Sequence, residues 1–337
     1  MKPDVVFRPS AITQKGKDGF FMPDFVALGE ILIDFMPCRT QDGRIAYSPY
    51  VGGAPANVSR AVAALGHSSA FVGKVGQDFF GTLCRESLAG DGVDIRHLVV
   101  DPQHPTTLAF VHLAHNGERS FSFYRTGTAD VSLSAQDISP ALLHSAKMVH
   151  IGSVSLTDEP SASATLHAIH TAKEAGALIS YDPNLRPRLW KDMNAARDVI
   201  QKPLSCCDIL KISAEETAFI AGECEPQKAA IALYRRYHIP LILVSMDKDG
   251  CCALYHGRFF SEPAFHIQAI DTTGAGDCFF AGILHSVMQY GCHLDDLTDE
   301  QIQFTLRFAN AMGACAALQM GAGCPNIDSV KQMAASR

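Results

Sequence analysis

Short apolar runs alternate with segments of helical periodicity along most of the chain. The first run, residues 25–35 (FVALGEILIDF), is interrupted by Gly29, which is typical of a buried strand that passes close to a ligand. Residues 54–66 then place apolar side chains at helical spacing and end on a glycine. Because this alternation recurs to the C-terminal region, the pattern predicts an α/β fold with a doubly wound, mostly parallel sheet flanked by helices.

Two segments break the alternation. Residues 39–51 and 106–126 show strand-like periodicity, and Asn116-Gly117 within the second is typical of a hairpin turn. Since an isolated hairpin is marginal in water, we expect these segments to pair into a small β-sheet that covers a cleft as a lid. Residues 1–23 are polar and without period, so they predict a flexible N-terminal extension before a domain of residues 24–337.

Composition and charge narrow the partners. The 337 residues carry a formal net charge of -7, so we expect no nucleic-acid or membrane partner, and any phosphate must be held by local groups. The 11 cysteines contain no C-x-x-C spacing and lie mostly in apolar segments, which favours buried, reduced thiols. No secretory or transmembrane segment is evident, so we expect a cytoplasmic protein.

The densest chemical signal lies in residues 265–291. We expect a strand ending at Asp271, a turn through Gly274 to Gly276, and a helix entered at Asp277. Glycines free the backbone N–H groups of Ala275, Gly276 and Asp277 to point at one anion, which the positive end of the helix also favours. The Asp277 carboxylate can then accept a proton from a hydroxyl that attacks phosphorus.

Alternatives to this interpretation stay open at the level of the motif. A Walker A loop would need a lysine after the last glycine, and a dinucleotide fingerprint would need glycine where Phe279 stands, so neither loop fits. The motif read alone is also compatible with a glycine turn capped by an aspartate.

Residues 50–66 carry a second signal. Gly52 and Gly53 allow a ligand to approach the backbone, and the Asn57 amide can donate to and accept from a sugar hydroxyl. Asp34 ends the first apolar run, at the sheet edge where α/β proteins bind ligands. A helix N-cap for Asn57 and a solvated acid for Asp34 are the alternatives.

The segments GGAPANVSRAVAALG and DTTGAGDCFFAGIL resemble the two signatures of the ribokinase-like, or phosphofructokinase-B, family of carbohydrate kinases. The resemblance extends from about residue 25 to residue 324. Between the signatures, LGEILIDF, NGERSFSFYR, SYDPNLRPRLW and DILKISAEE look most like fructokinase and 2-keto-3-deoxygluconate kinase members. The family implies a β-lid near residues 35–51 and 106–127, with ATP and Mg²⁺ as cofactors.

The resemblance also implies residue roles. Asp277 would be the base and Gly274, Ala275 and Gly276 the anion hole. Sugar or phosphate contacts would fall on Asp34, Gly52, Gly53, Asn57, Asn184 and Arg186. Nucleotide contacts would fall on Ser213, Glu216, Ser245, Asp247, Gly250 and Asn310, with Glu216 holding Mg²⁺ through water. Asp247 replaces a usual glycine, and Ser213 replaces a usual asparagine. A possible K⁺ site would use Asp271 and Thr273 with carbonyls from residues 314–323.

Side chains of the lid bear on the choice of substrate. Phe123 forms either a wall over the sugar or ordinary aromatic packing, and Arg125 reaches either an acidic sugar or solvent. We expect an ATP-dependent sugar kinase with fructose as substrate. The alternatives are a 2-keto-3-deoxygluconate kinase, a nucleoside or aminoimidazole riboside kinase, and a non-catalytic sugar-binding regulator. A homodimer through the lid is expected, because a sheet with one apolar face often finds a partner.

Overall fold

The larger of two sheets organises the molecule. In this computed structural model, which describes residues 23–113, 119–291 and 293–337, its strand order is β13-β12-β11-β10-β9-β8-β1-β4-β5. The strands are β1 (Phe25–Leu28), β4 (Ser69–Gly76), β5 (Leu98–Asp101), β8 (Met148–Gly152), β9 (Leu178–Asp182), β10 (Ile209–Ser213), β11 (Leu241–Ser245), β12 (Cys251–Tyr255) and β13 (Arg258–Glu262). From β5 to β11 all neighbours are parallel, whereas β12 and β13 add an antiparallel hairpin at one edge.

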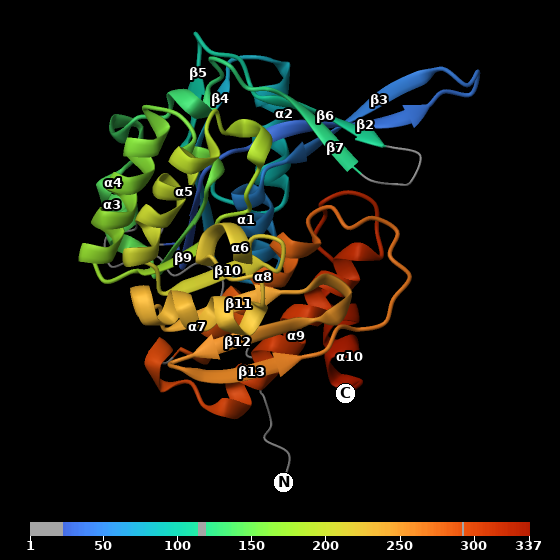
Figure 1. Cartoon of the computed structure of the whole chain (residues 1–337). Coiled ribbons are helices and arrows are strands. Elements are labelled where there is room, and N and C mark those ends of the chain that lie inside the picture. The colour runs from blue at the N-terminus through green and yellow to red at the C-terminus, as the bar shows by residue number, and fades with distance from the viewer. Residues whose placement is uncertain (1–22, 114–118, 292) are drawn as a thin grey trace.

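Helices cover both faces of this sheet (Figure 1). One core is formed with α1 (Ala54–Ala64), α2 (Phe79–Gly90), α8 (Ala275–Tyr290), α9 (Asp299–Ala317) and α10 (Ile327–Ala335). The other is formed with α3 (Pro140–Ser145), α4 (Ser161–Glu174), α5 (Met193–Gln201), α6 (Thr217–Ala221) and α7 (Pro226–Tyr237). Strand β1 sends Phe25 and Ala27 into the first core and Val26 and Leu28 into the second, which explains its uninterrupted apolar run. The predicted fold class is confirmed.

A second, four-stranded sheet projects from the body of the molecule, at the upper right of Figure 1. Its order is β3-β2-β6-β7, with β2 (Leu32–Arg39), β3 (Ile45–Gly52), β6 (Leu108–Leu113) and β7 (Arg119–Tyr124). Strand β2 pairs antiparallel with β3 and parallel with β6. The predicted turn at Asn116-Gly117 lies outside the described residues, as does nearly all of the predicted extension, 1–22.

The run predicted as one strand, residues 25–35, is in fact two strands in different sheets. Gly29 sits between them with a φ of 155°, and a Cβ there would lie 2.6 Å from the Cγ atom of Pro55. The chain can therefore leave the large sheet and enter the small one beside the start of α1. This junction brings the inner face of the small sheet to the carboxyl edge of β1.

The strand predicted to end at Asp271 is absent: residues 265–271 are irregular. The backbone N–H groups of Ile270 and Asp271 both donate to the carbonyl of Ala317, at 2.8 and 3.2 Å, and not to a neighbouring strand. The helix that follows begins at Ala275, two residues earlier than predicted, with Gly274 as its N-cap. No helix in the described part of the chain has the length and apolar character to cross a membrane.

Candidate active site

The carboxyl ends of the central strands and the inner face of the small sheet enclose a cavity, called here the central cavity. Among the predicted site residues it brings together Asp34, Gly53, Asn57, Phe123, Asn184, Arg186, Thr273, Gly274 and Asp277. They come from segments far apart in the chain, and they meet because parallel strands share one carboxyl edge. Glu30, which the sequence analysis did not single out, also lines the cavity.

Asp277 lies buried in the first turn of α8, with 8% of its surface exposed. The Asn57 side-chain amide donates a hydrogen bond to its Oδ2 atom at 2.8 Å. Burial raises the pKa of Asp277, while the hydrogen bond from Asn57 and the charges of Lys211 and Arg186 act to lower it. A held carboxylate with a raised pKa is suited to accept a proton from a bound hydroxyl.

The turn before α8 requires glycine for steric reasons. Gly274 has a φ of 75°, and a Cβ there would lie 2.8 Å from the Cβ of Ala322. Of the three predicted N–H donors, that of Ala275 donates to the Thr272 carbonyl at 3.2 Å. The N–H group of Ala275 is thus already used in a hydrogen bond within the turn. The N–H groups of Gly276 and Asp277 remain as the candidate donors to a bound anion.

A lysine that the sequence analysis missed lies beside this turn. Lys211 on β10 is buried, and its Nζ would be 3.5 Å from a Cβ added at Gly276. Its ammonium group forms an ion pair of 2.8 Å with Asp182 at the end of β9. Burial would lower the pKa of Lys211, but the carboxylates of Asp182, Glu216 and Asp277 raise it on balance, so it stays charged. The glycine turn therefore has a side-chain cation beside it, supplied by strand β10.

Asp34 on β2 lies across the cavity from Asp277. Burial raises its pKa to about 6, with Arg186 acting to lower it and Asp277 to raise it. A Cβ at Gly52 would collide with the Asp34 carboxylate, and one at Gly53, where φ is 111°, would collide with the Glu30 carbonyl oxygen. Both predicted glycines are therefore needed to keep the small sheet close to the cavity.

Asn184 and Arg186 follow β9 and line the cavity. Asn184 adopts a left-handed conformation with a φ of 44°. Behind them, Glu216 accepts hydrogen bonds from the backbone N–H groups of Leu185 at 2.6 Å and Ser213 at 2.7 Å. Glu216 therefore fixes the loop after β9 to the end of β10, a structural role that the sequence did not reveal.

Phe123 and Arg125 are both predicted to contact the substrate, but their side chains lie in different surroundings. Phe123 faces the cavity and stacks on Phe121 at 5.9 Å between ring centroids. Arg125 does not line it. Its guanidinium is buried and donates to Asp130 at 2.6 Å, to Thr157 at 2.5 Å and to the Val154 carbonyl at 3.0 Å. The predicted contact of Arg125 with a substrate is not supported, because its guanidinium donates to residues of the same chain.

The predicted nucleotide contacts lie outside the central cavity. Ser213 and Ser245 end the neighbouring strands β10 and β11 and face each other in register. Asp247, with a φ of 51°, and Gly250 belong to the turn after β11, where a Cβ at Gly250 would collide with the Glu262 carbonyl. Asn310 on α9 donates to the carbonyls of Glu262 and Pro263, each at 3.1 Å, so its amide anchors the end of β13.

Asp271 connects two segments near the glycine turn. Its Oδ1 accepts from the N–H of Thr273 at 2.8 Å, and its Oδ2 accepts from the N–H of Gly321 at 3.0 Å. The carboxylate is 2% exposed. At the predicted K⁺ position, the Asp271 carboxylate thus connects the glycine turn to the segment after α9 through backbone N–H groups.

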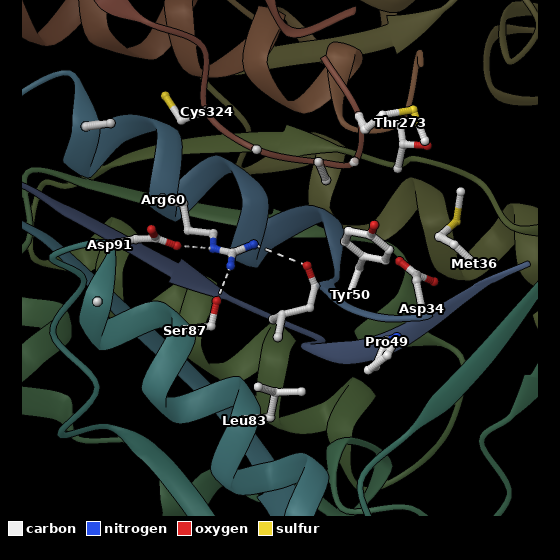
Figure 2. Close-up of a pocket in the computed structure, with 17 residues that line it drawn as sticks. Asp34, Met36, Pro49, Tyr50, Arg60, Leu83, Ser87, Asp91, Thr273 and Cys324 are labelled. Atoms are coloured by element: carbon white, nitrogen blue, oxygen red, sulfur yellow. Dashed lines mark hydrogen bonds and ion pairs between the residues drawn. The ribbon is translucent and has the colours of Figure 1, made fainter. Parts of the chain in front are cut away.

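A larger hollow of about 580 Å³ adjoins the central cavity (Figure 2). Arg60 of α1 points into it and binds Asp91 at 2.6 Å, the Val51 carbonyl at 3.2 Å and the Ser87 hydroxyl. The two hollows share only Asp34 and Thr273 among their lining residues. Asp277 lines the smaller, central cavity and does not line the larger hollow. The central cavity is therefore the candidate active site.

Known proteins resemble the chain over most of its length. It is 41% identical to fructokinase-1 of Oryza sativa subsp. japonica over 302 residues, which is 88% of this chain and 92% of that protein. Among solved structures, the fructokinase from Xylella fastidiosa with bound ATP has a TM-score of 0.86 and 33% identity, covering 93% of this chain and 99% of that one. A double mutant of the Vibrio cholerae O395 fructokinase, in a form with fructose, ADP and potassium ion bound, has a TM-score of 0.83 and 32% identity, covering 93% and 98%.

Fold, cavity and relatives together define a phosphotransferase that acts on a sugar hydroxyl. The family model described as pfkB family carbohydrate kinase matches residues 22–328. The chain belongs to the pfkB family of carbohydrate kinases.

Proposed function

We propose that the protein is an ATP-dependent fructokinase that transfers the γ-phosphoryl group of ATP to a hydroxyl of fructose. The observation that carries this proposal is the buried Asp277 at the start of α8, held by Asn57 in a cavity with Asp34 and Gly53. The relatives named above support it, because one is a fructokinase with bound ATP and another binds fructose and ADP.

The chemical step follows from the position of Asp277. The hydroxyl oxygen of fructose forms a bond to the γ-phosphorus, and the bond from that phosphorus to the bridging oxygen of ADP breaks. The hydroxyl proton passes to the Asp277 carboxylate, and ADP leaves with the bonding electron pair. The N–H groups of Gly276 and Asp277, with the Lys211 ammonium, face the charge that spreads over the transferred group.

Mg²⁺ would neutralise charge on the ATP phosphates when it is bound. Glu216 suits a contact through water, because each carboxylate oxygen has a second lone pair beyond the backbone N–H group that it accepts. Ser213 and Ser245 end β10 and β11, Asp247 and Gly250 lie in the turn after β11, and Asn310 contacts the end of β13. We assign the nucleotide to this part of the large sheet.

A panel of sugars tests the assignment. ADP release from MgATP is measured with fructose, 2-keto-3-deoxygluconate, ribose, adenosine and aminoimidazole riboside. We expect the highest kcat/KM with fructose, and a loss of about 10²- to 10⁴-fold in kcat for Asp277→Asn with fructose still bound. Preference for another compound would overturn fructose as the substrate. Full turnover by Asp277→Asn would show that Asp277 is not the catalytic base.

The small sheet is proposed to act as a lid. The central cavity measures only about 80 Å³, below the roughly 300 Å³ at which small-molecule pockets begin, with Phe121 and Phe123 on its wall. We infer that a sugar enters when the small sheet moves outward and is enclosed when it returns.

We further propose that K⁺ binds near Asp271 and Thr273, and that two copies pair through the small sheet. The buried Asp271 carboxylate supports the first, and the potassium ion bound to the Vibrio cholerae relative is consistent with it. An aromatic cluster on the outer face of the small sheet supports the second.

Ten described cysteines are free, which supports a cytoplasmic location.

A further inference from the structure

Glu30 is a buried acid that lines the central cavity. The residue follows β1 directly and is 4% exposed. Its Oε1 atom accepts the backbone N–H of Ala54, at the start of α1, at 3.1 Å. Its Oε2 atom has no hydrogen-bond partner within the described residues. One oxygen thus positions α1, and the other remains available.

A second orphaned acceptor lies in the same cavity. Asn57 donates through Nδ2 to Asp277, but its Oδ1 atom is buried and lacks a hydrogen-bond partner in the described part of the chain. Leaving a buried polar atom unpaired costs about 1–3 kcal/mol, and more for a charged group, so native proteins rarely retain one without a use. Asn57 Oδ1 accepts, and so does Glu30 Oε2 when the carboxylate is ionised, so the group missing beside them is a donor.

The charges around the cavity decide which donor fits. Three carboxyl groups line it, those of Glu30, Asp34 and Asp277, against the single cation Arg186 among the described lining residues. Burial raises the pKa of Glu30 to about 7, while its own backbone N–H and the charge of Arg125 act to lower it. The Arg125 guanidinium itself donates to Asp130, Thr157 and the Val154 carbonyl. A substrate bearing a carboxylate or phosphate would meet repulsion there, whereas hydroxyl groups would supply the missing protons.

We propose that Glu30 is a specificity-determining residue: its Oε2 atom, together with Asn57 Oδ1, accepts hydrogen bonds from substrate hydroxyls and selects uncharged sugars against sugar acids and sugar phosphates. The assignment rests on the proposed function of the cavity and deepens it. It also distinguishes fructose from 2-keto-3-deoxygluconate, whose carboxylate would face Glu30, Asp34 and Asp277 with Arg186 as the one cation among the described lining residues.

The test is Glu30→Gln. Glutamine keeps an oxygen for the Ala54 N–H but replaces the unpaired Oε2 acceptor with an NH₂ donor. We expect the fructose Kd and KM to rise by about 10- to 100-fold, the scale of one hydrogen bond to a charged group, with kcat changing far less. Binding of 2-keto-3-deoxygluconate relative to fructose should improve by at least about 10-fold, because one repulsive charge is removed.

Deoxyfructose analogues provide a readout that a purely structural role would not change. In the wild type, removal of the hydroxyl that donates to Glu30 should weaken binding by at least about 10-fold, and in Glu30→Gln the same removal should cost much less. Glu262→Gln is the matched control: this carboxylate is also buried, accepts from Gln303 at 2.5 Å, and does not line the cavity. Its fructose Kd should be unchanged.

The outcomes distinguish a failure of the Glu30 assignment from a failure of the proposed function. An unchanged fructose Kd in folded Glu30→Gln, with equal losses across the deoxy series, would overturn the role of Glu30 and leave Oε2 to a buried water. Wild-type preference for 2-keto-3-deoxygluconate would overturn both the role and the proposed fructokinase. If Glu30→Gln fails to fold, the wild-type series decides: no position at which hydroxyl removal weakens binding, or a sugar acid that binds as tightly as fructose, would overturn the assignment.

Discussion

Lys211 is the residue whose environment most changes the chemistry of the glycine turn. It reaches the turn from β10, and Asp182 holds its ammonium group at 2.8 Å. A Cβ at Gly276 would lie 3.5 Å from that group, so a phosphoryl oxygen over the turn comes within reach of both the backbone N–H groups and the cation. In a buried site such a fixed charge is worth far more than in water.

Substitution of Lys211 separates this catalytic role from stability. Lys211→Met should lower kcat by at least about 10²-fold, as expected for the loss of a fixed donor to the transferred group. It should also reduce the free energy of unfolding by about 3–5 kcal/mol, because the Asp182 carboxylate is left buried and unpaired. Steady-state kinetics and urea unfolding measure the two effects.

The double variant Lys211→Met with Asp182→Asn is the control for that experiment. Removal of both charges should restore most of the stability without restoring kcat, since the buried carboxylate no longer lacks a partner. Recovery of turnover in the double variant would mean that Lys211 acts only by neutralising Asp182.

At the scale of elements, the start of α8 is held by the segment that follows α9. Ala317 accepts the N–H groups of Ile270 and Asp271, and Asp271 in turn accepts that of Gly321. Gly274 packs against Ala322 so closely that a Cβ would not fit. The position of the anion-binding turn therefore depends on a contact between two loops that are about 50 residues apart in the chain.

A monovalent cation is expected to strengthen this contact. Replacing KCl by tetramethylammonium chloride at constant ionic strength should lower kcat by about 10-fold or more, because the Asp271 carboxylate and nearby carbonyls lose a cation that fixes the turn. Activity measured across a KCl titration provides the check. An activity that is indifferent to the exchange would rule out the K⁺ site.

At the scale of the whole molecule, the outer face of the small sheet carries a cluster of aromatic side chains. Phe35, Tyr47, Phe110 and Tyr124 pack there as ring pairs 4.7 to 5.5 Å apart. Tyr124 is nevertheless 64% exposed. Alternation along the strands places Asp34 and Phe123 on the opposite face, toward the cavity. The sheet thus has one face toward the cavity and an opposite aromatic face, on which Phe35 also packs against Phe80 of α2 and Tyr124 stays exposed.

Tyr124→Asp tests the dimer through the small sheet. We expect the wild type to sediment as a dimer at micromolar concentration and the variant as a monomer, because a charge would be buried at the centre of the aromatic contact. Phe259→Asp on β13, an equally large change at a ring that is 40% exposed at the far edge of the large sheet, should leave the dimer intact. A wild type that is monomeric throughout would remove the proposal.

Much of the fold was predictable because its signals are local. The recurring apolar runs and helical periods are set by residues a few positions apart, and they predicted the large sheet, its helices and the separate small sheet. Residues 265–271 were predicted wrongly as a strand, since they alternate like one, but the antiparallel hairpin of β12 and β13 takes that edge of the sheet. Strand character is completed by a partner, which the local pattern does not specify.

The sequence by itself determined where the glycine turns lie and that Asp277 lies near the start of a helix, and it predicted Asp34 and Asn57 in ligand-binding segments. Only the tertiary structure decided what surrounds them: Lys211 beside Gly276, Arg125 paired with Asp130, and Glu30 with one carboxylate oxygen that lacks a hydrogen-bond partner among the described residues. The physical reason is that residue type and spacing encode what a side chain can do, whereas burial, pKa and available hydrogen bonds depend on neighbours brought together from distant parts of the chain.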